Sequence, residues 1–338
     1  MTQQAHEAPP RRRGGRSFRT IALGGAALTV VMVSIAVALY FRFIRYERVA
    51  IRHVPADAVT VVRLDVEQAP VYEPVRRHLL PLLGGPESPP EEGDARLFRI
   101  EGRSGLHRGD LRELVFAFLG GSPGGWVLAL GGIFPASAGN AVLAETLRAE
   151  WPEFAPTDDG VAIVHRGLGI AVGRARDRVV LVASSEKELR AALEPTDAHE
   201  RLGVPRRGPG ALAVTGEALR RAEAWPAVLR RPELMAVLKR LSSVTGNLEL
   251  GERLTLHLVL HAAGSSDAAR AASDAVSLMR ALRRDEPSPA TVLLGSGADR
   301  ATVSNPDGRT ADLALTWERE EVDQGFSLLA AVAGHELQ

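Results

Sequence analysis

The stretch from Ile21 to Phe41 has the strongest effect on what this chain can fold into. It is 21 residues long and contains no charged residue. About 20 apolar residues form a helix long enough to cross the roughly 30 Å hydrocarbon core of a bilayer. Lipid cannot satisfy backbone polar groups, so a single segment that crosses it must be helical. We therefore expect a transmembrane helix over residues 21–41, preceded by a basic cytoplasmic tail over residues 1–20.

Arginines flank this segment on both sides. Five precede it and four follow it: Arg11, Arg12, Arg13, Arg16 and Arg19, then Arg42, Arg45, Arg48 and Arg52. The positive-inside rule favours a cytoplasmic N-terminus. We expect a single-pass protein of the bacterial cytoplasmic membrane, with its C-terminal region outside the cytoplasm. Anionic lipid headgroups are the expected contacts of the first four arginines, Arg11, Arg12, Arg13 and Arg16.

Two other interpretations of the segment remain open. The run from Ala36 to Ala38 is similar to a signal-peptidase site, so the segment could be cleaved after Ala38. The apolar run continues to Phe41, however, so it is longer than the apolar region of a cleaved signal peptide, which usually has about 7–15 residues. A buried core helix is the other interpretation, but a helix that is apolar all round at a chain terminus favours a membrane span. We favour an uncleaved signal anchor.

Charge and cysteine content exclude several classes of function. Eight arginines and two glutamates give residues 1–48 a net charge of +6; the whole chain is neutral, so residues 49–338 carry −6. A mildly acidic folded region argues against a nucleic-acid partner, which favours a basic face. The chain has no cysteine. Disulfides, thiolate metal sites, cysteine nucleophiles and lipidated cysteines are therefore excluded.

The region after the anchor divides into two halves with the same order of elements. Each half has a strand, a helix, a strand pair, a helix, further strands and a helix. We expect a first half over residues 54–195, a linker rich in Pro and Gly over 196–210 and a second half over 211–338. Short turns between strands indicate antiparallel sheets with helices packed on one face. The predicted fold class is α+β, with two similar halves.

Hydrophobic periodicity and turn-forming residues predict where the individual strands and helices begin and end. The predicted strands cover residues 59–66, 114–119, 126–130, 161–165, 168–172, 179–183, 211–215, 248–250, 254–261, 290–294, 301–304 and 312–317. The predicted helices cover residues 71–83, 140–151, 186–193, 217–241, 267–284 and 322–332, and residues 84–95 are expected to form a loop.

His257 and His261 are the residues most similar to a metal-binding pair. An HxxxH pair chelates zinc when it lies on a helix. Here leucine alternates with other residues from Leu254 to Leu260, which predicts a strand. Residues four apart in a strand are separated by about 13 Å. We therefore interpret the histidines as the solvated side of a half-buried strand.

Other motifs also favour structural explanations. Gly167, Gly169 and Gly173 lack the spacing of a dinucleotide-binding loop and lie in a strand pattern. Ser185 begins a capping box, and neither it nor Ser184 lies in a nucleophile elbow. The carboxylates form no predicted acid–base pair: Asp65 and Glu67, Asp158 and Asp159, and Glu318, Glu320 and Glu321. We predict no catalytic, cofactor-binding or metal-binding residue and no cofactor.

Two stretches are similar to a known group of proteins. Residues 54–58 (VPADA) lead directly into the strand VTVVRLDV, and residues 170–193 form a strand, a charged turn, a strand and a capped helix. Both stretches resemble a pattern in uncharacterised bacterial proteins that have one N-terminal membrane anchor and a duplicated α+β exported region. The resemblance implies the layout described above but no activity and no functional residue.

These observations predict a membrane-anchored envelope protein of unknown activity, whose exported region is a non-enzymatic binding or scaffolding module. Its expected partners are the bilayer and another envelope protein. The alternative is a membrane-anchored, hydrolase-like enzyme whose site combines residues distant in sequence. A sensor ectodomain is a third interpretation, although a tail of 20 residues would need a partner in the membrane to pass on a signal.

Overall fold

A computed structural model describes the folded part of the chain. The described residues are 47–68, 72–74, 77, 92–122, 124–135, 137–176, 178–206, 208–221, 231–264, 267–285, 289–304, 308–325 and 327. Two units can be distinguished, Met1–Glu47 and Arg48–Gln338; everything below concerns the second. The predicted tail and the predicted anchor, Ile21–Phe41, lie outside the described residues. Within the described ranges, no helix combines the length and the hydropathy that a membrane span requires.

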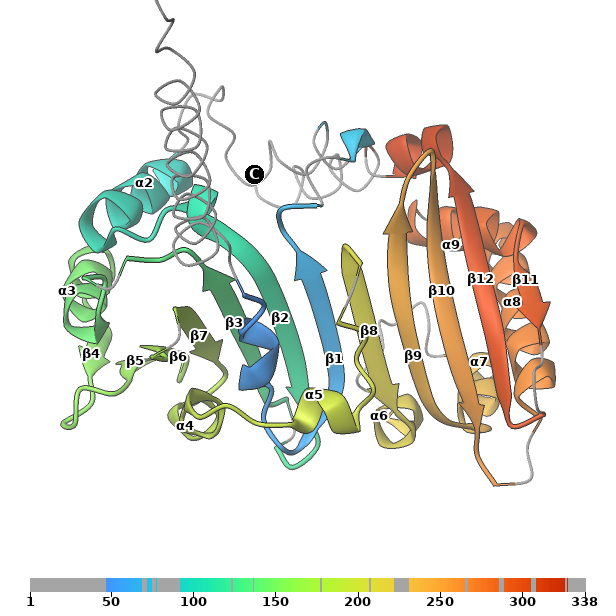
Figure 1. Cartoon of the computed structure of the whole chain (residues 1–338), viewed down its shortest axis with the longest axis horizontal. Coiled ribbons are helices and arrows are strands. Elements are labelled where there is room, and N and C mark those ends of the chain that lie inside the picture. The colour runs from blue at the N-terminus through green and yellow to red at the C-terminus, as the bar shows by residue number, and fades with distance from the viewer. Residues whose placement is uncertain are drawn as a thin grey trace, which may run out of the picture. The chain divides into compact units, whose positions relative to one another are not determined.

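The second unit is built on one antiparallel sheet of twelve strands (Figure 1). The strands are β1 (Ala58–Asp65), β2 (Leu111–Leu119), β3 (Trp126–Gly132), β4 (Phe154–Pro156), β5 (Ile163–His165), β6 (Ala171–Arg174), β7 (Val179–Ala183), β8 (Gly210–Thr215), β9 (Leu241–Leu250), β10 (Arg253–Ala262), β11 (Thr302–Ser304) and β12 (Thr310–Glu318). The described helices are α2 (Glu92–Ser104), α3 (Asn140–Glu150), α4 (Glu186–Leu193), α5 (Ala198–Arg201), α6 (Gly216–Arg220), α7 (Pro232–Leu238), α8 (Ala268–Asp285) and α9 (Pro289–Asp299). The α+β class predicted from the sequence is confirmed.

The order of strands is similar on the two sides of the central pair β1–β8. The sheet runs β11-β12-β10-β9-β8-β1-β2-β3-β7-β6-β5-β4. Outward from β1, a hairpin (β2–β3) is followed by β7 and β6; outward from β8, a hairpin (β9–β10) is followed by β12 and β11. One continuous sheet therefore joins the two sides, where the sequence suggested separate sheets. The division of the chain at residues 196–210 stays a prediction, and this segment contains the short helix α5.

Cross-strand partners define two faces of the sheet. Leu64 pairs with Leu114, Leu114 pairs with Leu130, and paired residues point to the same side. We call the side that carries Leu64 the apolar face and the other side, which carries Arg63, the opposite face. Side chains alternate along each strand, so neighbouring residues of β1 belong to different faces.

Helices cover both ends of the apolar face. At one end, Leu143 and Leu147 of α3 pack against Val172 and Val180 of β6 and β7. At the other end, α7 and α8 form a larger core with β10 and β12. Members of this core include Leu234, Leu238, Ala272, Val276, Leu260, Leu313, Leu315 and Trp317. The two cores leave the middle of the sheet between them.

The prediction that helices pack on one face is wrong for α4. A Cβ atom at Gly173 would lie 3.1 Å from Leu189 of α4. Gly173 follows Val172, which packs against α3, so α3 and α4 lie on opposite sides of β6. The opposite face needs this cover because β7 is apolar on both sides: Leu181 and Val180 are both buried.

Two further predictions are wrong because a short pattern fits more than one element. Residues 290–294 were expected to form a strand but belong to helix α9, because a short apolar run does not distinguish a strand from a buried helix. The predicted helix 217–241 contains α6 and α7, but β9 begins at Leu241, where pairing with β8 and β10 outweighs the helical pattern.

Several elements of the structure were not predicted, and two predicted helices lie mostly outside the described residues. Helix α2 begins within the expected loop 84–95, and β4 was not expected. Most of the predicted helix 71–83 lies outside the described residues. Of the predicted helix 322–332, the described residues 322–325 are helical, within a helical stretch that begins at residue 319.

Candidate functional site

The middle of the apolar face carries large apolar side chains that are open to solvent. Phe118 is 46% exposed, Leu64 is 40% exposed and Val62 is 36% exposed. Half-buried neighbours surround these three: Leu114, Phe116, Trp126, Leu128, Leu130, Leu212 and Val214. We call these ten residues the sheet floor. Solvent-exposed apolar side chains that gather in one patch mark an interaction surface more often than isolated ones do.

Strand pairing places the sheet floor in rows across four strands. Val62 on β1 lies between Phe116 on β2 and Leu212 on β8, and Phe116 pairs in turn with Leu128 on β3. The aromatic rings contact each other as well. The ring centroid of Phe116 lies 4.7 Å from that of Phe118, edge to face, and 5.8 Å from that of Trp126, in a stacked arrangement. Such contacts hold the aromatic side chains in place.

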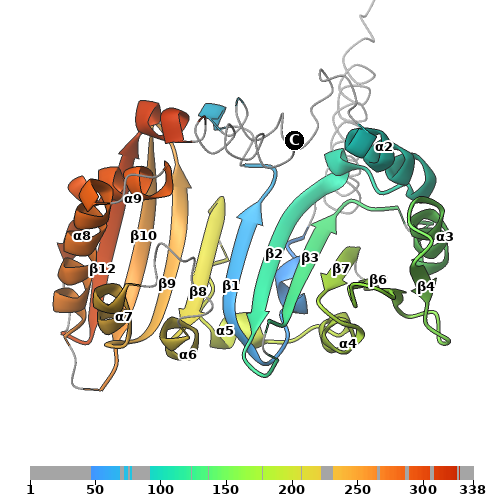
Figure 2. The same ribbon diagram turned by 180° about the vertical axis from the view of Figure 1, so that it is seen from behind.

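The covering helices leave the centre of the sheet floor open, whereas its outer members Leu130, Leu212 and Val214 pack against the two cores. Figure 2 shows α7, α8 and α9 over one end of this face and α2 and α3 towards the other, with β8, β1, β2 and β3 between the two groups. All ten side chains of the floor are uncharged. A ligand on this surface would be recognised by shape and apolar contact, and its burial would contribute about 25 cal/mol for each Å² removed from water.

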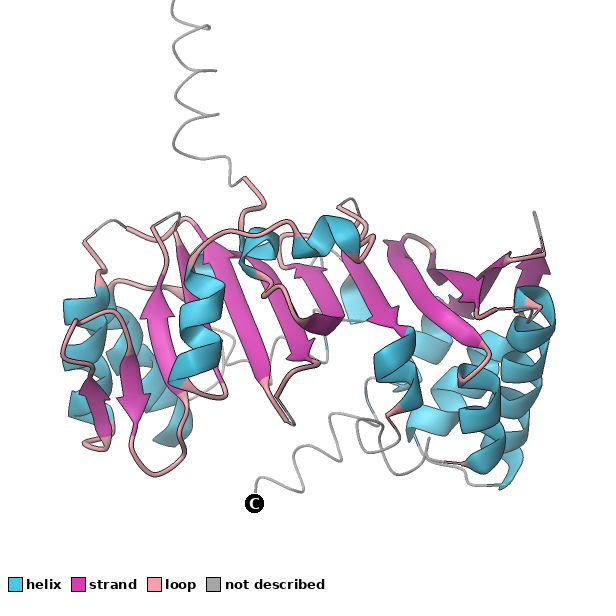
Figure 3. Ribbon diagram, turned by 90° about the horizontal axis from the view of Figure 1, so that it is seen from below, coloured by secondary structure: helices cyan, strands magenta, loops and turns pink. Residues whose placement is uncertain are grey.

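The opposite face of β1 holds a buried charged cluster. Arg63, Asp65 and Glu113 are at most 4% exposed. Asp65 forms an ion pair with Arg48, and Glu113 Oε2 accepts a hydrogen bond from the backbone N–H of Ala50 at 3.1 Å. Arg63 Nη2 donates to the carbonyl oxygen of Gly208 at 2.8 Å. Figure 3 shows helices on both sides of the sheet, and Figure 1 places helix α5 in front of the sheet, on the side opposite to α7 and α8.

Burial affects the ionisation of this cluster. Desolvation lowers the pKa of the Arg63 guanidinium, and Arg48 lowers it further, whereas Glu113 and Asp65 raise it. The charges are therefore held by one another and by backbone groups inside the fold.

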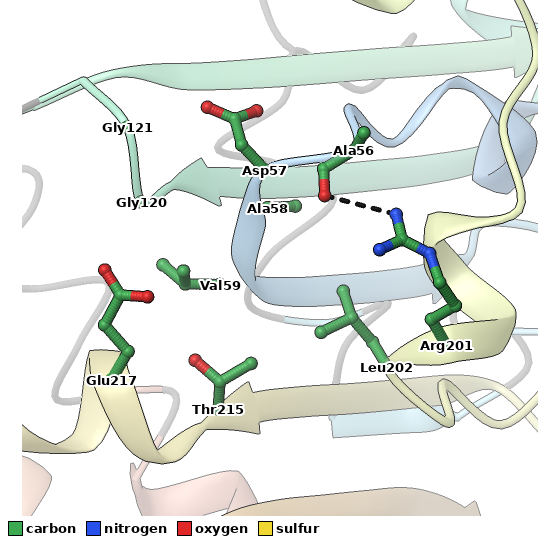
Figure 4. A pocket seen from close by; sticks show the side chains of 10 residues that line it. All are labelled: Ala56, Asp57, Ala58, Val59, Gly120, Gly121, Arg201, Leu202, Thr215 and Glu217. Carbon is green, nitrogen blue, oxygen red and sulfur yellow. Dashed lines mark hydrogen bonds between the residues drawn. The ribbon is translucent and has the colours of Figure 1, made fainter.

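A pocket at one end of the central strands is the second candidate. It has a volume of about 540 Å³. Its lining residues are Ala56, Asp57, Ala58, Val59, Gly120, Gly121, Arg201, Leu202, Thr215 and Glu217. Figure 4 shows Asp57, Glu217 and Arg201 approaching it from three different segments. A Cβ atom at Gly120 would lie 2.6 Å from Val59 Cγ1, so a larger residue there would disturb the hairpin that closes this side.

The polar groups of this pocket hold the fold together. Arg201 donates to the carbonyl oxygen of Ala56 at 3.2 Å. Glu217 forms an ion pair with Arg221, and the hydroxyl of Thr215 caps helix α6 by accepting a hydrogen bond from the backbone N–H of Ala218. The lining side chains include neither a histidine nor a serine. Two of its polar side chains, Arg201 and Glu217, and the hydroxyl of Thr215 are thus engaged in contacts within the fold.

The two histidines singled out in the sequence lie on strand β10, as predicted. Leu254, Leu256 and Leu258 of the same strand contribute to the core. His257 Nε2 lies 3.3 Å from Glu249 Oε2 on β9. Within the described ranges, no three histidine or carboxylate side chains gather in a way that could hold a metal ion.

The other motifs have structural roles. Ser185 caps α4 by accepting a hydrogen bond from the backbone N–H of Glu188 at 3.5 Å, which confirms its N-cap role, whereas the Glu188 side chain accepts from the hydroxyl of Ser122 at 2.9 Å. The hydroxyl oxygen of Ser184 accepts from the backbone N–H of Trp126 at 2.9 Å. Gly169 has a φ of +71°, which suits a turn residue. Gly167 belongs to the same turn, between β5 and β6.

The acidic residues singled out in the sequence do not meet in one cleft. Asp65 is in the buried cluster, and Glu67 pairs with Arg112 at 2.8 Å. Asp159 accepts hydrogen bonds from Thr157 and from the backbone N–H of Val161, and it pairs with Arg190. Glu318 and Glu321 pair with Arg300.

The sheet floor was missed by the sequence analysis. In VTVVRLDV, Arg63 and Asp65 indicate the solvated side of the strand, whereas in the structure that side is buried. A better sequence signal lies in β2, where Leu114, Phe116 and Phe118 alternate with Val115, Ala117 and Leu119. A strand that is apolar on both sides needs cover on both sides.

Comparisons with known proteins identify no family for this chain. No protein-family model matches it. No curated protein matches it either. The chain is similar to a solved structure, "Structure of crystal form I of TP0453", with a TM-score of 0.44 and 14% sequence identity, over 85% of this chain and 99% of that chain. A similarity at this level supports no statement about function.

Proposed function

We propose that this chain is a membrane-anchored envelope protein whose folded unit is a non-enzymatic binding module, and that its sheet floor binds an amphipathic helix of a partner protein. One observation carries the proposal: Val62, Leu64 and Phe118 stay exposed in the middle of a sheet whose two ends are covered by helices. An amphipathic helix that lays its apolar side into an apolar groove is a common mode of recognition.

The dimensions of the sheet floor support a helix as the partner. Adjacent strands lie about 4.8 Å apart, so β3 and β8, with β2 and β1 between them, are separated by about 14 Å. An α-helix with its side chains is about 10–12 Å in diameter. The width of one helix is therefore similar to the spacing from β3 to β8. A flat bilayer surface fits less well, because the helices over both ends of this face would hold it away from the exposed residues between them.

The predicted anchor supports a location at the membrane. Six residues separate Phe41 from Arg48. Six extended residues span at most about 21 Å. With a membrane-spanning helix over 21–41 and a cytoplasmic N-terminus, the binding module works outside the cytoplasm and close to the bilayer. A partner helix would then belong to an envelope protein.

An anchored hydrolase, the alternative from the sequence, has less support. Its site would need a nucleophile, a base and donors for the developing charge. The pocket of Figure 4 presents Asp57, Glu217 and Arg201, two of which are engaged in contacts within the fold. The sheet floor has no ionisable group at all.

A photoreactive phenylalanine analogue at position Phe118 of the full chain tests the proposal in cells. A matched control carries the analogue at Leu168, which is 68% exposed on the turn between β5 and β6. We expect one protein adduct at position 118, absent at position 168, whose crosslinked peptide has apolar residues at helical spacing. The additional substitution Leu64→Gln should reduce its yield at least fivefold. Equal adducts at both positions, or lipid adducts alone, would contradict the proposal.

A further inference from the structure

Three arginines at the end of β6 and in the turn that follows it line one small hollow. Arg174, Arg176 and Arg178 alternate along the turn, and all three border a space of about 290 Å³ together with Gly139, Asn140 and Ala175. A space of this size lies at the lower limit of ligand pockets, which begin at about 300 Å³. It suits a compact group better than an extended ligand. The hollow is separate from the sheet floor and from the pocket of Figure 4, with which it shares no residue.

The contacts of Arg174 fix one guanidinium group in the wall of the hollow. It donates to the carbonyl oxygen of Ala138 and to that of Phe134, the latter at 3.4 Å. The backbone N–H of Arg174 donates to Asn140 Oδ1 at 2.8 Å, and Asn140 Nδ2 donates to the carbonyl oxygen of Val161 at 3.0 Å. These bonds join the turn to the start of helix α3, so the hollow is built by two elements that are held together.

Two of the arginines lie close enough for their like charges to interact, Arg174 and Arg178. Burial lowers the pKa of Arg174, and the charge of Arg178 lowers it further. Among the described side chains, no carboxylate forms an ion pair with any of the three arginines. Arg178 is also held at a φ of +68°, a backbone conformation that side chains other than glycine rarely adopt. Three like charges kept together in this way favour the binding of an anion.

The start of α3 adds donors at the same place. Gly139 is the N-cap residue and provides no side chain to cap the helix. The N–H groups of the first helical turn have no partner within the helix. A negative group near them is stabilised by the helix dipole. The helix contributes to the hollow, while the three guanidinium groups supply most of the positive charge.

We propose that this hollow binds the phosphate group of a phosphate ester. Guanidinium groups form paired hydrogen bonds with phosphate oxygens, and three of them match the charge and the number of acceptors of a phosphate better than those of a carboxylate. The ester is either a soluble metabolite or the headgroup of an anionic lipid, since both present negatively charged non-bridging phosphate oxygens. The inference does not depend on the helix-binding role of the sheet floor.

Binding by the full chain in a detergent free of phosphate tests the inference. The ligands are inorganic phosphate, glycerol 3-phosphate and dihexanoylphosphatidylglycerol, measured by calorimetry at low and high salt. The test variant combines Arg176→Gln with Arg178→Asn, because asparagine tolerates a positive φ. The control combines Arg148→Gln with Arg166→Gln, two exposed arginines that do not line the hollow. Both variants remove two positive charges.

We expect the dissociation constant of at least one of the three ligands to rise tenfold or more in the test variant and to stay within twofold in the control. Binding of inorganic phosphate or glycerol 3-phosphate supports a soluble ester, and binding of the lipid alone supports a headgroup. Equal weakening in both variants would show general attraction by positive charge and overturn the inference. Absence of binding by all three ligands would overturn it as well. Circular dichroism of both variants confirms that the fold is retained.

Discussion

Arg63 is fully buried, whereas Leu64, the next residue of β1, is 40% exposed. This reverses the usual arrangement of a half-buried strand, in which the charged side faces water. The buried side is stabilised by Asp65, Glu113 and backbone carbonyl groups. The exposed side adds Leu64 to the sheet floor. The proposed binding of a partner helix depends on this reversal.

Substitutions at these two neighbours should change the stability of the fold to very different extents. Arg63→Ala removes a buried cation that interacts with Glu113 and Asp65 and should reduce the free energy of unfolding by about 3–5 kcal/mol. Leu64→Gln changes an exposed side chain and should alter it by less than about 0.5 kcal/mol. Urea unfolding followed by circular dichroism measures both. A loss of stability in Leu64→Gln as large as that in Arg63→Ala would show that Leu64 belongs to the core.

Two helical glycines provide a second matched pair. A Cβ atom at Gly297 of α9 would lie 2.3 Å from Cε2 of Trp317, which is held by its indole N–H on the carbonyl oxygen of Leu293. Gly297→Ala should therefore lower stability by about 1–3 kcal/mol. Gly102 of α2 has no atom within 4 Å of its Cβ position, so Gly102→Ala should raise stability by about 0.5–1 kcal/mol. The difference in melting temperature between the two variants tests the contact between α9 and Trp317. An unchanged melting temperature for Gly297→Ala would show that Gly297 does not pack closely against Trp317.

Buried His199 should make the fold sensitive to mild acid. Burial lowers its pKa below the usual 6.5, and the positive charge of Arg206 lowers it further, against the weaker opposing effect of Glu200. Above pH 6.5 the histidine is neutral in both the folded and the unfolded chain. As the pH falls below 6.5, the unfolded chain takes up the proton first, and stability is lost until the folded pKa is reached.

The variant His199→Gln should therefore lose less stability than the original chain between pH 7.5 and pH 5.5. Urea unfolding at several pH values measures the difference. His257→Gln serves as the control, because the His257 side chain is 43% exposed. If the free energy of unfolding depends on pH in the same way for His199→Gln and for the original chain, His199 does not contribute to the acid sensitivity of the fold.

The membrane topology has its own test. Alkaline phosphatase fused after Gln338 should be active in cells, because the enzyme folds only after export and we expect residues 49–338 outside the cytoplasm. Removal of residues 1–41 should abolish that activity. An inactive fusion, together with a fluorescent cytoplasmic reporter at the same position, would contradict the predicted orientation.

Local sequence patterns were sufficient to predict much of the sheet and several of the helices. The alternating leucines of β10 and the capping box of α4 are complete signals within ten residues, and both elements form where they were expected. The prediction of a strand over residues 290–294, which belong to helix α9, failed for a physical reason. Its apolar run has no periodicity of its own, and its structure depends on contact with Trp317, which lies on a strand more distant in sequence.

The sheet floor depends even more on distant residues. Whether Leu64 or Arg63 faces the interior of the fold is decided by Glu113 and Asp65, by Arg48 and by the backbone of Gly208. These groups come from four separate segments of the chain. The alternation of side chains along β1 predicts which residues share a face, but it does not predict which of the two faces the rest of the fold covers. The arginine hollow was missed for a similar reason, since it joins the β6–β7 turn to the start of α3.

The central claim, that a partner covers the sheet floor in the native membrane, can be tested by the labelling of a single cysteine. The chain has no cysteine of its own, so Leu64→Cys introduces a unique thiol on the floor and Leu168→Cys introduces one on an exposed turn. We predict that a maleimide labels Leu64→Cys at least tenfold more slowly in native membranes than after purification in detergent, while Leu168→Cys reacts equally in both. Equal rates for Leu64→Cys in the two preparations, fast or slow, would contradict the claim.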